Sequence, residues 1–179
     1  FGIEHSSVIP DAMALGKSIA SGMPVGALVA RKGLMEKGFA ITTLGGNPIG
    51  AAAGLATLDV IEKSRLPENA ARMGRYMMKL LNELKERHQL IGDVRGKGLI
   101  VGIEFVKSRR TKEPARKETA KIVYRAWQLG LITAYVGANG NVMEITPPLT
   151  ITKRQIGIGV EILERAIKDA PIYKHAASR

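Results

Sequence analysis

The chain has 179 residues and 45% hydrophobic content, so it can bury a core and is expected to form one domain, or one domain and part of another. Its 27 Lys and Arg against 16 Asp and Glu give a net charge of +11, which permits attraction to phosphates or nucleic acid but decides little alone. The lack of cysteine excludes disulfides and thiolate chemistry, and three scattered histidines predict no metal site. Without a membrane-length apolar run or a signal-peptide pattern, we expect a cytoplasmic protein.

The first half of the chain predicts one strand and two helices. The apolar run VGALVA, residues 25–30, is typical of a short buried strand. Asn47 and Pro48 fit the N-cap and first residue of a helix that extends to about Lys63, and its many Gly and Ala residues predict close packing. A second helix is expected from about Asn69 to Arg87. We interpret its Met and Leu stripe as core: Met73, Met77, Leu80, Leu81 and Leu84.

The second half predicts a sheet with two further helices. Residues 90–106 are interpreted as a turn followed by a strand, whose apolar residues alternate from Leu99 to Phe105. A charged loop leads into a helix from near Pro114 to near Gly130, and the glycines of GANG then join strands 131–136 and 141–146. Thr152 and Gln155 form a capping box that opens a final helix, Lys153 to about Lys168. This order indicates an α/β or α+β layered fold.

Lys17 is the first candidate for chemistry. It lies in ALGKSIASGMPVGALVA, residues 14–30, between apolar flanks and a Gly/Ser-rich turn that allows a bulky planar group to approach the backbone. Desolvation by such flanks favours the neutral amine, which attacks carbonyls to form a Schiff base. Taken alone, this window fits an ordinary surface lysine better.

A second segment suits a phosphate group. TTLGGNPIGAAAG, residues 42–54, combines two hydroxyls, a glycine turn and a helix N-terminus, where backbone N–H groups and the helix dipole favour anions. An ordinary capped helix explains the segment equally well by itself.

Taken together, four ordered blocks resemble the class III aminotransferases, the pyridoxal-phosphate enzymes of fold type I. The blocks are PDAMALGKSIASGMPVGALVA, TTLGGNPIGAAAGLATLDVI, IGDVRGKGLIVGIEF and PPLTIT. The resemblance implies that Lys17 carries pyridoxal 5′-phosphate as a Schiff base, and that Thr43 reaches the cofactor phosphate of the neighbouring subunit. It therefore also implies a homodimer with shared active sites.

The resemblance further implies a domain division. Residues 1–64 correspond to the end of the large cofactor-binding domain and a connecting helix, residues 65–170 to a small C-terminal domain with a mainly antiparallel sheet covered by helices, and residues 171–179 to a tail. The family's acidic partner of the pyridinium nitrogen, its phosphate-binding loop and its stacking aromatic lie upstream of this segment. The chain is therefore expected to be a C-terminal fragment, inactive or nearly so in isolation.

Glu144 departs from the family's transaminase pattern. Where those enzymes carry an arginine that clamps the substrate carboxylate, NGNVMEITPPLTIT has Glu144, and a carboxylate does not clamp a carboxylate. Residues 113–152 resemble instead the α-amino-ε-caprolactam racemase branch and its amino-acid racemase relatives. This favours racemisation or epimerisation of a neutral amino acid or aminolactam. A 4-aminobutyrate- or ornithine-type aminotransferase is the alternative, and a solvent-facing strand residue is the plain explanation of Glu144.

A basic run offers a rival function of another class. VKSRRTKEPARK, residues 106–117, carries six basic residues, which is the charge pattern of a nucleic-acid-binding module. It lacks an aromatic residue to stack on a base, and such runs are usually solvated loops, so we expect neither a nucleic-acid nor a membrane partner.

Overall fold

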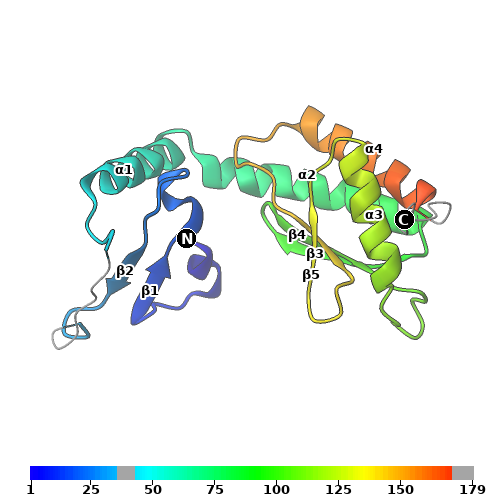
Figure 1. The fold of residues 1–179 in the computed structure, drawn as a ribbon, viewed down its shortest axis with the longest axis horizontal. Coiled ribbons are helices and arrows are strands. Elements are labelled where there is room, and N and C mark those ends of the chain that lie inside the picture. Colours follow the sequence, from blue (N-terminus) through cyan, green and yellow to red (C-terminus); the bar gives the residue numbers. More distant parts are fainter. Residues whose placement is uncertain (36–42, 171–179) are drawn as a thin grey trace. The chain divides into compact units, whose positions relative to one another are not determined.

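The computed structural model describes residues 1–35 and 43–170. The chain divides into two compact units, Phe1–Arg65 and Leu66–Arg179, which run from blue to cyan and from green to red in Figure 1. The first unit has a two-stranded sheet, and the second has a four-stranded sheet of order β3-β4-β6-β5.

The first unit is built on a β-hairpin and one helix. Strands β1 (Ala12–Leu15) and β2 (Ala27–Ala30) pair antiparallel, and a 3-10 turn, η2 (Lys17–Ala20), lies between them. The predicted strand is thus confirmed in its last four residues, but the prediction that it is buried is wrong for the described residues, because Leu28 and Val29 are exposed. Strand β1 was not predicted, because its four residues are too few to show a clear alternation of apolar and polar side chains.

Helix α1 (Pro48–Lys63) begins as predicted. The Asn47 side chain accepts a hydrogen bond from the backbone N–H of Ile49 at 3.0 Å, and Pro48 occupies the first helical position. Gly50 and Gly54 are buried: a Cβ atom on Gly50 would lie 2.5 Å from Val25 Cγ2, and one on Gly54 would lie 3.9 Å from the carbonyl oxygen of Ile19. Gly50 therefore permits the close packing that the sequence predicts, whereas the separation at Gly54 is ordinary van der Waals contact.

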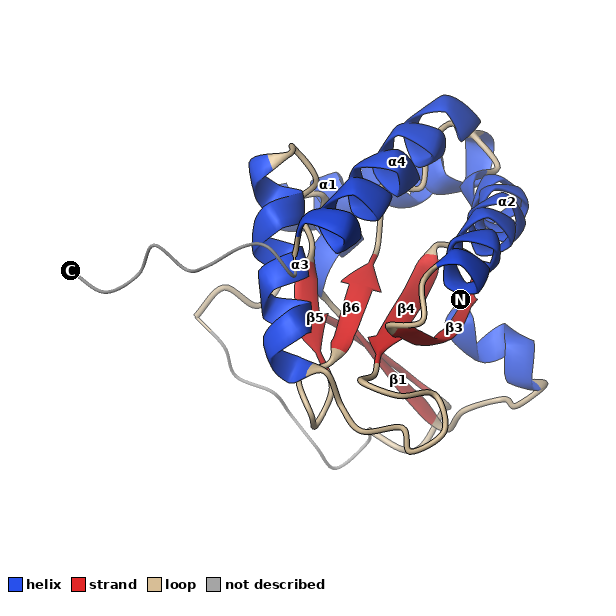
Figure 2. Cartoon of the chain, turned by 90° about the vertical axis from the view of Figure 1, so that its right-hand side faces the viewer, coloured by secondary structure: helices blue, strands red, loops and turns tan. Residues whose placement is uncertain are grey.

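The second unit is a four-stranded antiparallel sheet with helices packed on it (Figure 2). Its elements are α2 (Leu66–Arg87), β3 (Ile91–Lys97), β4 (Ile100–Phe105), α3 (Arg116–Gln128), β5 (Ala134–Val136), β6 (Val142–Ile145) and α4 (Lys153–Asp169). The helices and the β5–β6 pair lie where the sequence predicts them, within a few residues. A mainly antiparallel sheet covered by helices is thereby confirmed.

The interpretation of residues 91–97 as a turn is wrong, because these residues form strand β3. The strand pairs with β4 from Ile91↔Phe105 to Lys97↔Ile100, and the turn is confined to Gly98 and Leu99. The glycines of β3 are typical of a turn, and they were interpreted as one. In the structure they have another role, since a Cβ atom on Gly96 would lie 2.3 Å from the carbonyl oxygen of Ile100. Glycine is required here for close approach of two backbones rather than for a reversal.

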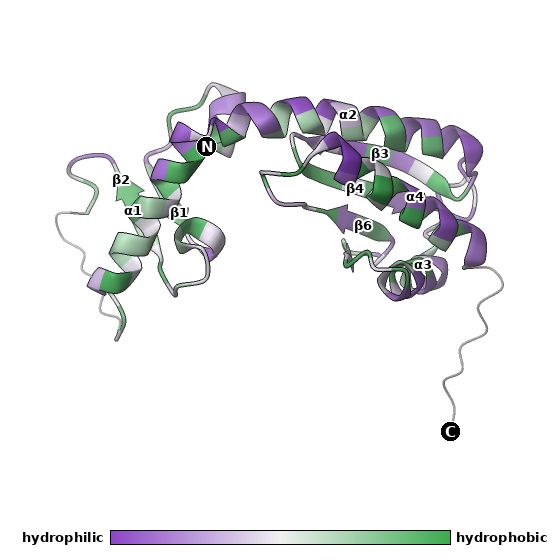
Figure 3. Cartoon of the chain, turned by 90° about the horizontal axis from the view of Figure 1, so that it is seen from above, coloured by the Kyte–Doolittle hydropathy of each residue, from purple (hydrophilic) through white to green (hydrophobic). Residues whose placement is uncertain are grey.

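The core lies between one face of this sheet and the helices. Strand residues Val101, Ile103, Phe105 and Met143 are buried, whereas their alternating neighbours Gly102 and Glu144 are half-buried on the opposite face. The Met and Leu stripe of α2 packs into this core as predicted, and Figure 3 shows α2 alternating between hydrophobic and hydrophilic bands.

Helix α4 is fixed at its start by the predicted capping box. The backbone N–H of Gln155 donates to Thr152 Oγ1 at 3.3 Å, and the Gln155 side chain accepts from the backbone N–H of Thr152 at 2.9 Å. The loop before the helix is held by Asn69 of α2, whose side-chain amide donates to the carbonyl oxygens of Leu149 and Ile151 at 2.7 and 3.2 Å.

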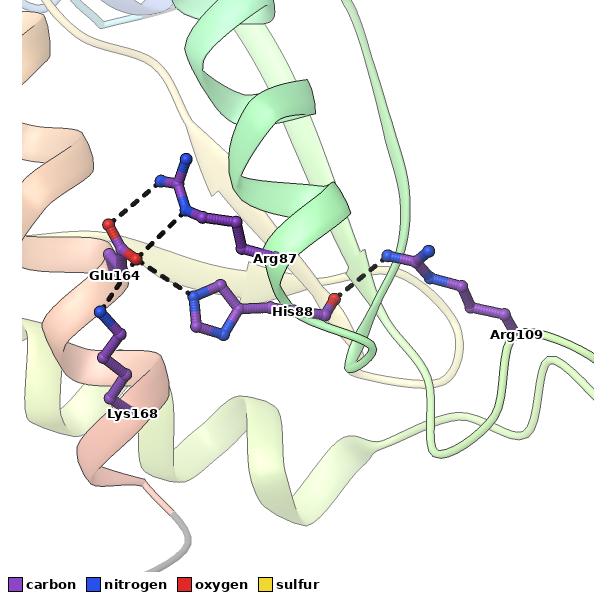
Figure 4. A network of polar contacts seen from close by, with 5 residues as sticks. All are labelled: Arg87, His88, Arg109, Glu164 and Lys168. Atoms are coloured by element: carbon purple, nitrogen blue, oxygen red, sulfur yellow. Dashed lines mark hydrogen bonds and ion pairs between the residues drawn. The ribbon is translucent and has the colours of Figure 1, made fainter.

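A polar network joins the end of α2 to α4 (Figure 4). Glu164 contacts Lys168 at 3.0 Å, Arg87 at 3.1 Å and His88 at 3.5 Å. These groups, led by Lys168, lower the pKa of Glu164 from 4.5 to about 2, although burial acts in the opposite direction. Nearby, the Arg109 guanidinium donates to the carbonyl oxygens of Lys85, His88 and Ile91, and so caps the end of α2.

Glu164→Gln is expected to destabilise the second unit by about 1 kcal/mol at neutral pH. Because the pKa of Glu164 is lower in the folded than in the unfolded state, its contribution is present above pH 4.5 and is lost as the pH falls toward about 2. Urea unfolding at several pH values should therefore show that the free energies of unfolding of wild type and Glu164→Gln become equal in acid. Glu83→Gln, in a more exposed helix pair with Lys79 at 3.9 Å, is the control and should change little. A pH-independent difference between wild type and Glu164→Gln would contradict this prediction.

Candidate functional site

Lys17 occupies a strained backbone position. It is the first residue of η2 and has φ of 57°, and Ser21, which ends the turn, has φ of 47°. Left-handed conformations cost a residue with a side chain on the order of 1 kcal/mol or more, so they persist where the surroundings hold them. The lysine proposed for chemistry therefore lies on a turn with left-handed residues at both ends.

The Lys17 side chain is exposed in this chain. The apolar flanks of Lys17 predict a desolvated amine, but the residues that the structure describes do not bury it. Within η2 only Ala20 is buried, at 1% exposure. The amine is available to a ligand without any rearrangement of these residues.

Thr43 lies in the turn of residues 43–46 that leads into α1, and its side chain is also exposed. Gly46 has φ of 72°, a left-handed conformation that glycine adopts without strain. Thr42, the other hydroxyl of the predicted phosphate segment, lies outside the described residues. Since Asn47 caps the N–H of Ile49 and Pro48 has none, the first helical turn offers fewer free donors than the sequence suggested.

Glu144 lies in the second unit, in the middle of β6. It is paired with Gly102 of β4 and Ala134 of β5, and its backbone carbonyl oxygen accepts a hydrogen bond from the Thr133 hydroxyl. Its side chain is half-buried on the sheet face that the helices leave uncovered. The same face carries Arg95, whose guanidinium lies 2.6 Å from Glu104.

Two hydroxyl residues that the sequence did not single out connect the Lys17 turn to α1. Ser21 Oγ and Thr57 Oγ1 lie 3.0 Å apart, and Thr57 Oγ1 lies 2.8 Å from the carbonyl oxygen of Ala53. Ser21 belongs to the Gly/Ser-rich turn, but nothing in the local sequence around Thr57 indicates that the two side chains meet.

The basic run of residues 106–117 is partly engaged within the protein. Lys107 pairs with Glu113 at 2.5 Å, and Arg109 is the cap of α2 described above. Across residues 1–35 and 43–170, no group of three or more His, Cys, Asp or Glu residues is arranged to hold a metal ion. In the same ranges, no helix is both long and apolar enough to cross a membrane.

Two curated amino-acid racemases are similar to nearly the whole chain. A leucine/methionine racemase of Thermococcus litoralis is 46% identical over 173 residues, and an alanine/serine racemase of Pyrococcus horikoshii is 46% identical over 171 residues. Each alignment covers 94% of this chain but only 38% and 36% of the respective relative. The chain thus spans little more than a third of the length of these relatives.

A solved structure and a family model agree with these relatives. An amine transaminase from an uncultivated Pseudomonas species, solved in its pyridoxal-phosphate-bound form, superposes with a TM-score of 0.85 at 32% identity over 94% of this chain and 40% of its own. The predicted fold type I is confirmed by this superposition, and that transaminase holds pyridoxal phosphate, the cofactor predicted here. The model of the class-III aminotransferases matches residues 1–167. The chain therefore belongs to the class-III aminotransferase family.

Proposed function

We propose that the protein containing this chain is a pyridoxal-phosphate-dependent enzyme that racemises or epimerises a neutral amino acid or an aminolactam. The observation that carries this proposal is the exposed amine of Lys17 on its turn of left-handed residues, in a chain 46% identical to a leucine/methionine racemase over 94% of its length.

The residues present fit the cofactor. A primary amine on an accessible turn can bond to the carbonyl of pyridoxal phosphate, and the exposed hydroxyl of Thr43 can donate to a phosphate oxygen. Asn47 already caps the N–H of Ile49, and the resemblance to the class III aminotransferases implies Thr43 as the phosphate contact. When bound, the cofactor supplies an electron-withdrawing ring that stabilises negative charge at the substrate's α-carbon.

Lys17 then serves as the base. Its Nζ accepts the proton that leaves the α-carbon, and in racemisation a proton returns to the opposite face of the same carbon. Return of the proton to a different atom, the one next to the cofactor ring, leads to transamination instead. The atom that receives the proton thus decides between the two reaction classes.

We also propose that the two units belong to two different domains of the whole enzyme. The first unit corresponds to the end of the large cofactor-binding domain, and the second to the small C-terminal domain. Two copies share their sites as a homodimer, with Thr43 contributed to the neighbouring subunit. The chain in isolation is inactive, because other parts of the large domain hold the pyridinium partner and stacking groups that the family uses.

The test of this function combines labelling with product analysis. The protein is incubated with pyridoxal phosphate, reduced with borohydride and mapped by mass spectrometry, and label on Lys17 is expected. A single L-amino acid is then supplied without any keto acid, and chiral chromatography should show the D-enantiomer accumulating. Absence of label at Lys17 would refute the cofactor role.

An aminotransferase is the second candidate, favoured by the structural match to an amine transaminase. For an aminotransferase we expect no conversion of the amino acid until an amino acceptor is added, and then a stoichiometric exchange of amino and keto groups between the two substrates. The same chiral assay with and without a keto acid therefore separates the two functions.

Glu144→Arg tests the proposed substrate class. A carboxylate at this half-buried strand position disfavours substrates anchored by a second carboxylate, whereas arginine would attract them. We expect the ratio of kcat/KM for an acidic over a neutral amino acid to rise at least about tenfold, the effect of one charge-assisted hydrogen bond. Arg95→Lys, on the same face and with its charge retained, is the control. An unchanged preference would assign Glu144 a solvent-facing role only.

A further inference from the structure

The turn that carries Lys17 requires stabilising contacts with residues outside the turn. Left-handed φ values at Lys17 and Ser21 disfavour this conformation in a free peptide, so contacts outside the turn must select it. Backbone hydrogen bonds such as Ser21 N–H to the carbonyl oxygen of Ser18, at 3.1 Å, close the turn but do not attach it to the rest of the unit.

Helix α1 supplies the attachment by backbone proximity and by a hydrogen bond. The carbonyl oxygen of Ile19 lies beside the buried Gly54 of α1, and 3.9 Å would separate it from an ideal Cβ atom there, which is ordinary van der Waals contact. One helical turn further on, Thr57 Oγ1 lies 3.0 Å from Ser21 Oγ.

The direction of this hydrogen bond follows from the bond that Thr57 already makes. The Thr57 hydroxyl donates its one proton to the carbonyl oxygen of Ala53 at 2.8 Å, so its oxygen is left as an acceptor. Ser21 is therefore the donor, and the chain of bonds runs from Ser21 through Thr57 to Ala53. Each hydroxyl proton has a defined acceptor, which fixes both side chains.

We propose that Thr57, acting through Ser21, is a positioning residue for the Lys17 amine. The pair holds the left-handed end of the turn against α1 and thereby sets the direction in which the Lys17 side chain leaves the backbone. This inference rests on the proposed function of Lys17 and adds to it a residue on another element, 36 residues from Ser21 in the sequence.

The test compares three variants in the intact protein that contains this chain. Thr57→Val removes the hydroxyl and keeps the shape, Thr57→Ser restores the hydroxyl, and Ser18→Ala is a matched loss of a hydroxyl within the turn. The readout is the rate of borohydride-trapped labelling by pyridoxal phosphate at Lys17 relative to exposed Lys32, together with the pH midpoint of the cofactor's absorbance change.

Thr57→Val is expected to lower the Lys17:Lys32 labelling ratio about fivefold, the population change that one hydrogen bond of ordinary net strength supports, and to move the pH midpoint. Thr57→Ser and Ser18→Ala should match wild type. If Thr57→Val is poorly folded by circular dichroism, Ser21→Ala replaces it with the same expectation.

The outcomes separate this proposal from the proposed function. A wild-type protein without selective label at Lys17 refutes the cofactor role, and the positioning role falls with it. If wild type is labelled selectively at Lys17 and Thr57→Val is labelled to the same extent, the positioning role of Thr57 is overturned while the cofactor role of Lys17 stands. Failure of Thr57→Ser to restore labelling also overturns it, because the hydroxyl would then not be the cause.

Discussion

Replacing Lys17 by alanine is expected to lower amino-acid turnover by about 10³-fold or more in the intact protein. Under the proposed function, the substitution removes both the amine that bonds to the cofactor and the base that moves the α-proton, and general-base contributions alone are about 10² to 10⁴. The measurement is kcat/KM from chiral chromatography, together with borohydride trapping and peptide mapping.

Lys32→Ala is the matched control for this change. Lys32 is an exposed lysine of the same unit, in the turn that follows β2, and nothing assigns it to the site. Turnover by this variant should equal that of wild type. If Lys17→Ala kept more than a tenth of the wild-type rate, another amine would have to be the base, and the assignment of Lys17 would fail.

Gly74→Ala is expected to cause the largest loss of stability in the second unit, about 3 kcal/mol or more. A Cβ atom at this buried position of α2 would lie 2.1 Å from the carbonyl oxygen of Gly98, at the turn between β3 and β4. Because the obstacle is backbone, a side-chain rotation cannot relieve it, and the helix must move away from the sheet. Urea unfolding followed by circular dichroism measures the effect.

Gly157→Ala provides the comparison, since it makes the same change within α4. A Cβ atom there meets nothing within 4 Å, so the substitution should be neutral or should stabilise the protein by up to about 1 kcal/mol through helix propensity. Equal midpoints for Gly74→Ala and Gly157→Ala would show that α2 does not pack on the β3–β4 turn as described.

Features that depend on near neighbours in the chain were readable from the sequence. The cap of α1 joins Asn47 to Ile49, and the capping box of α4 joins Thr152 to Gln155, so each is contained in one short pattern. The apolar periodicity of α2 likewise predicted its buried face. The four blocks that resemble the class III aminotransferases indicated the family, and the roles of Lys17 and the cofactor were predicted from that resemblance.

Features that depend on distant partners required the tertiary structure. Strand β3 is defined by its pairing with β4, and its glycines look like a turn until the partner backbone is placed beside them. The hydrogen bond from Ser21 to Thr57 spans 36 residues, and the contact of His88 with Glu164 spans 76.

The physical reason is the range of the interactions. Hydrogen bonds within one helical turn are fixed by backbone geometry that a few residues specify. Contacts across tens of residues form only after hydrophobic burial has closed the chain, and which side chains then meet depends on the packing of whole elements. The sequence by itself therefore determined the family and the helix ends and predicted the role of Lys17, whereas the tertiary structure decided which strands pair and which distant side chains meet.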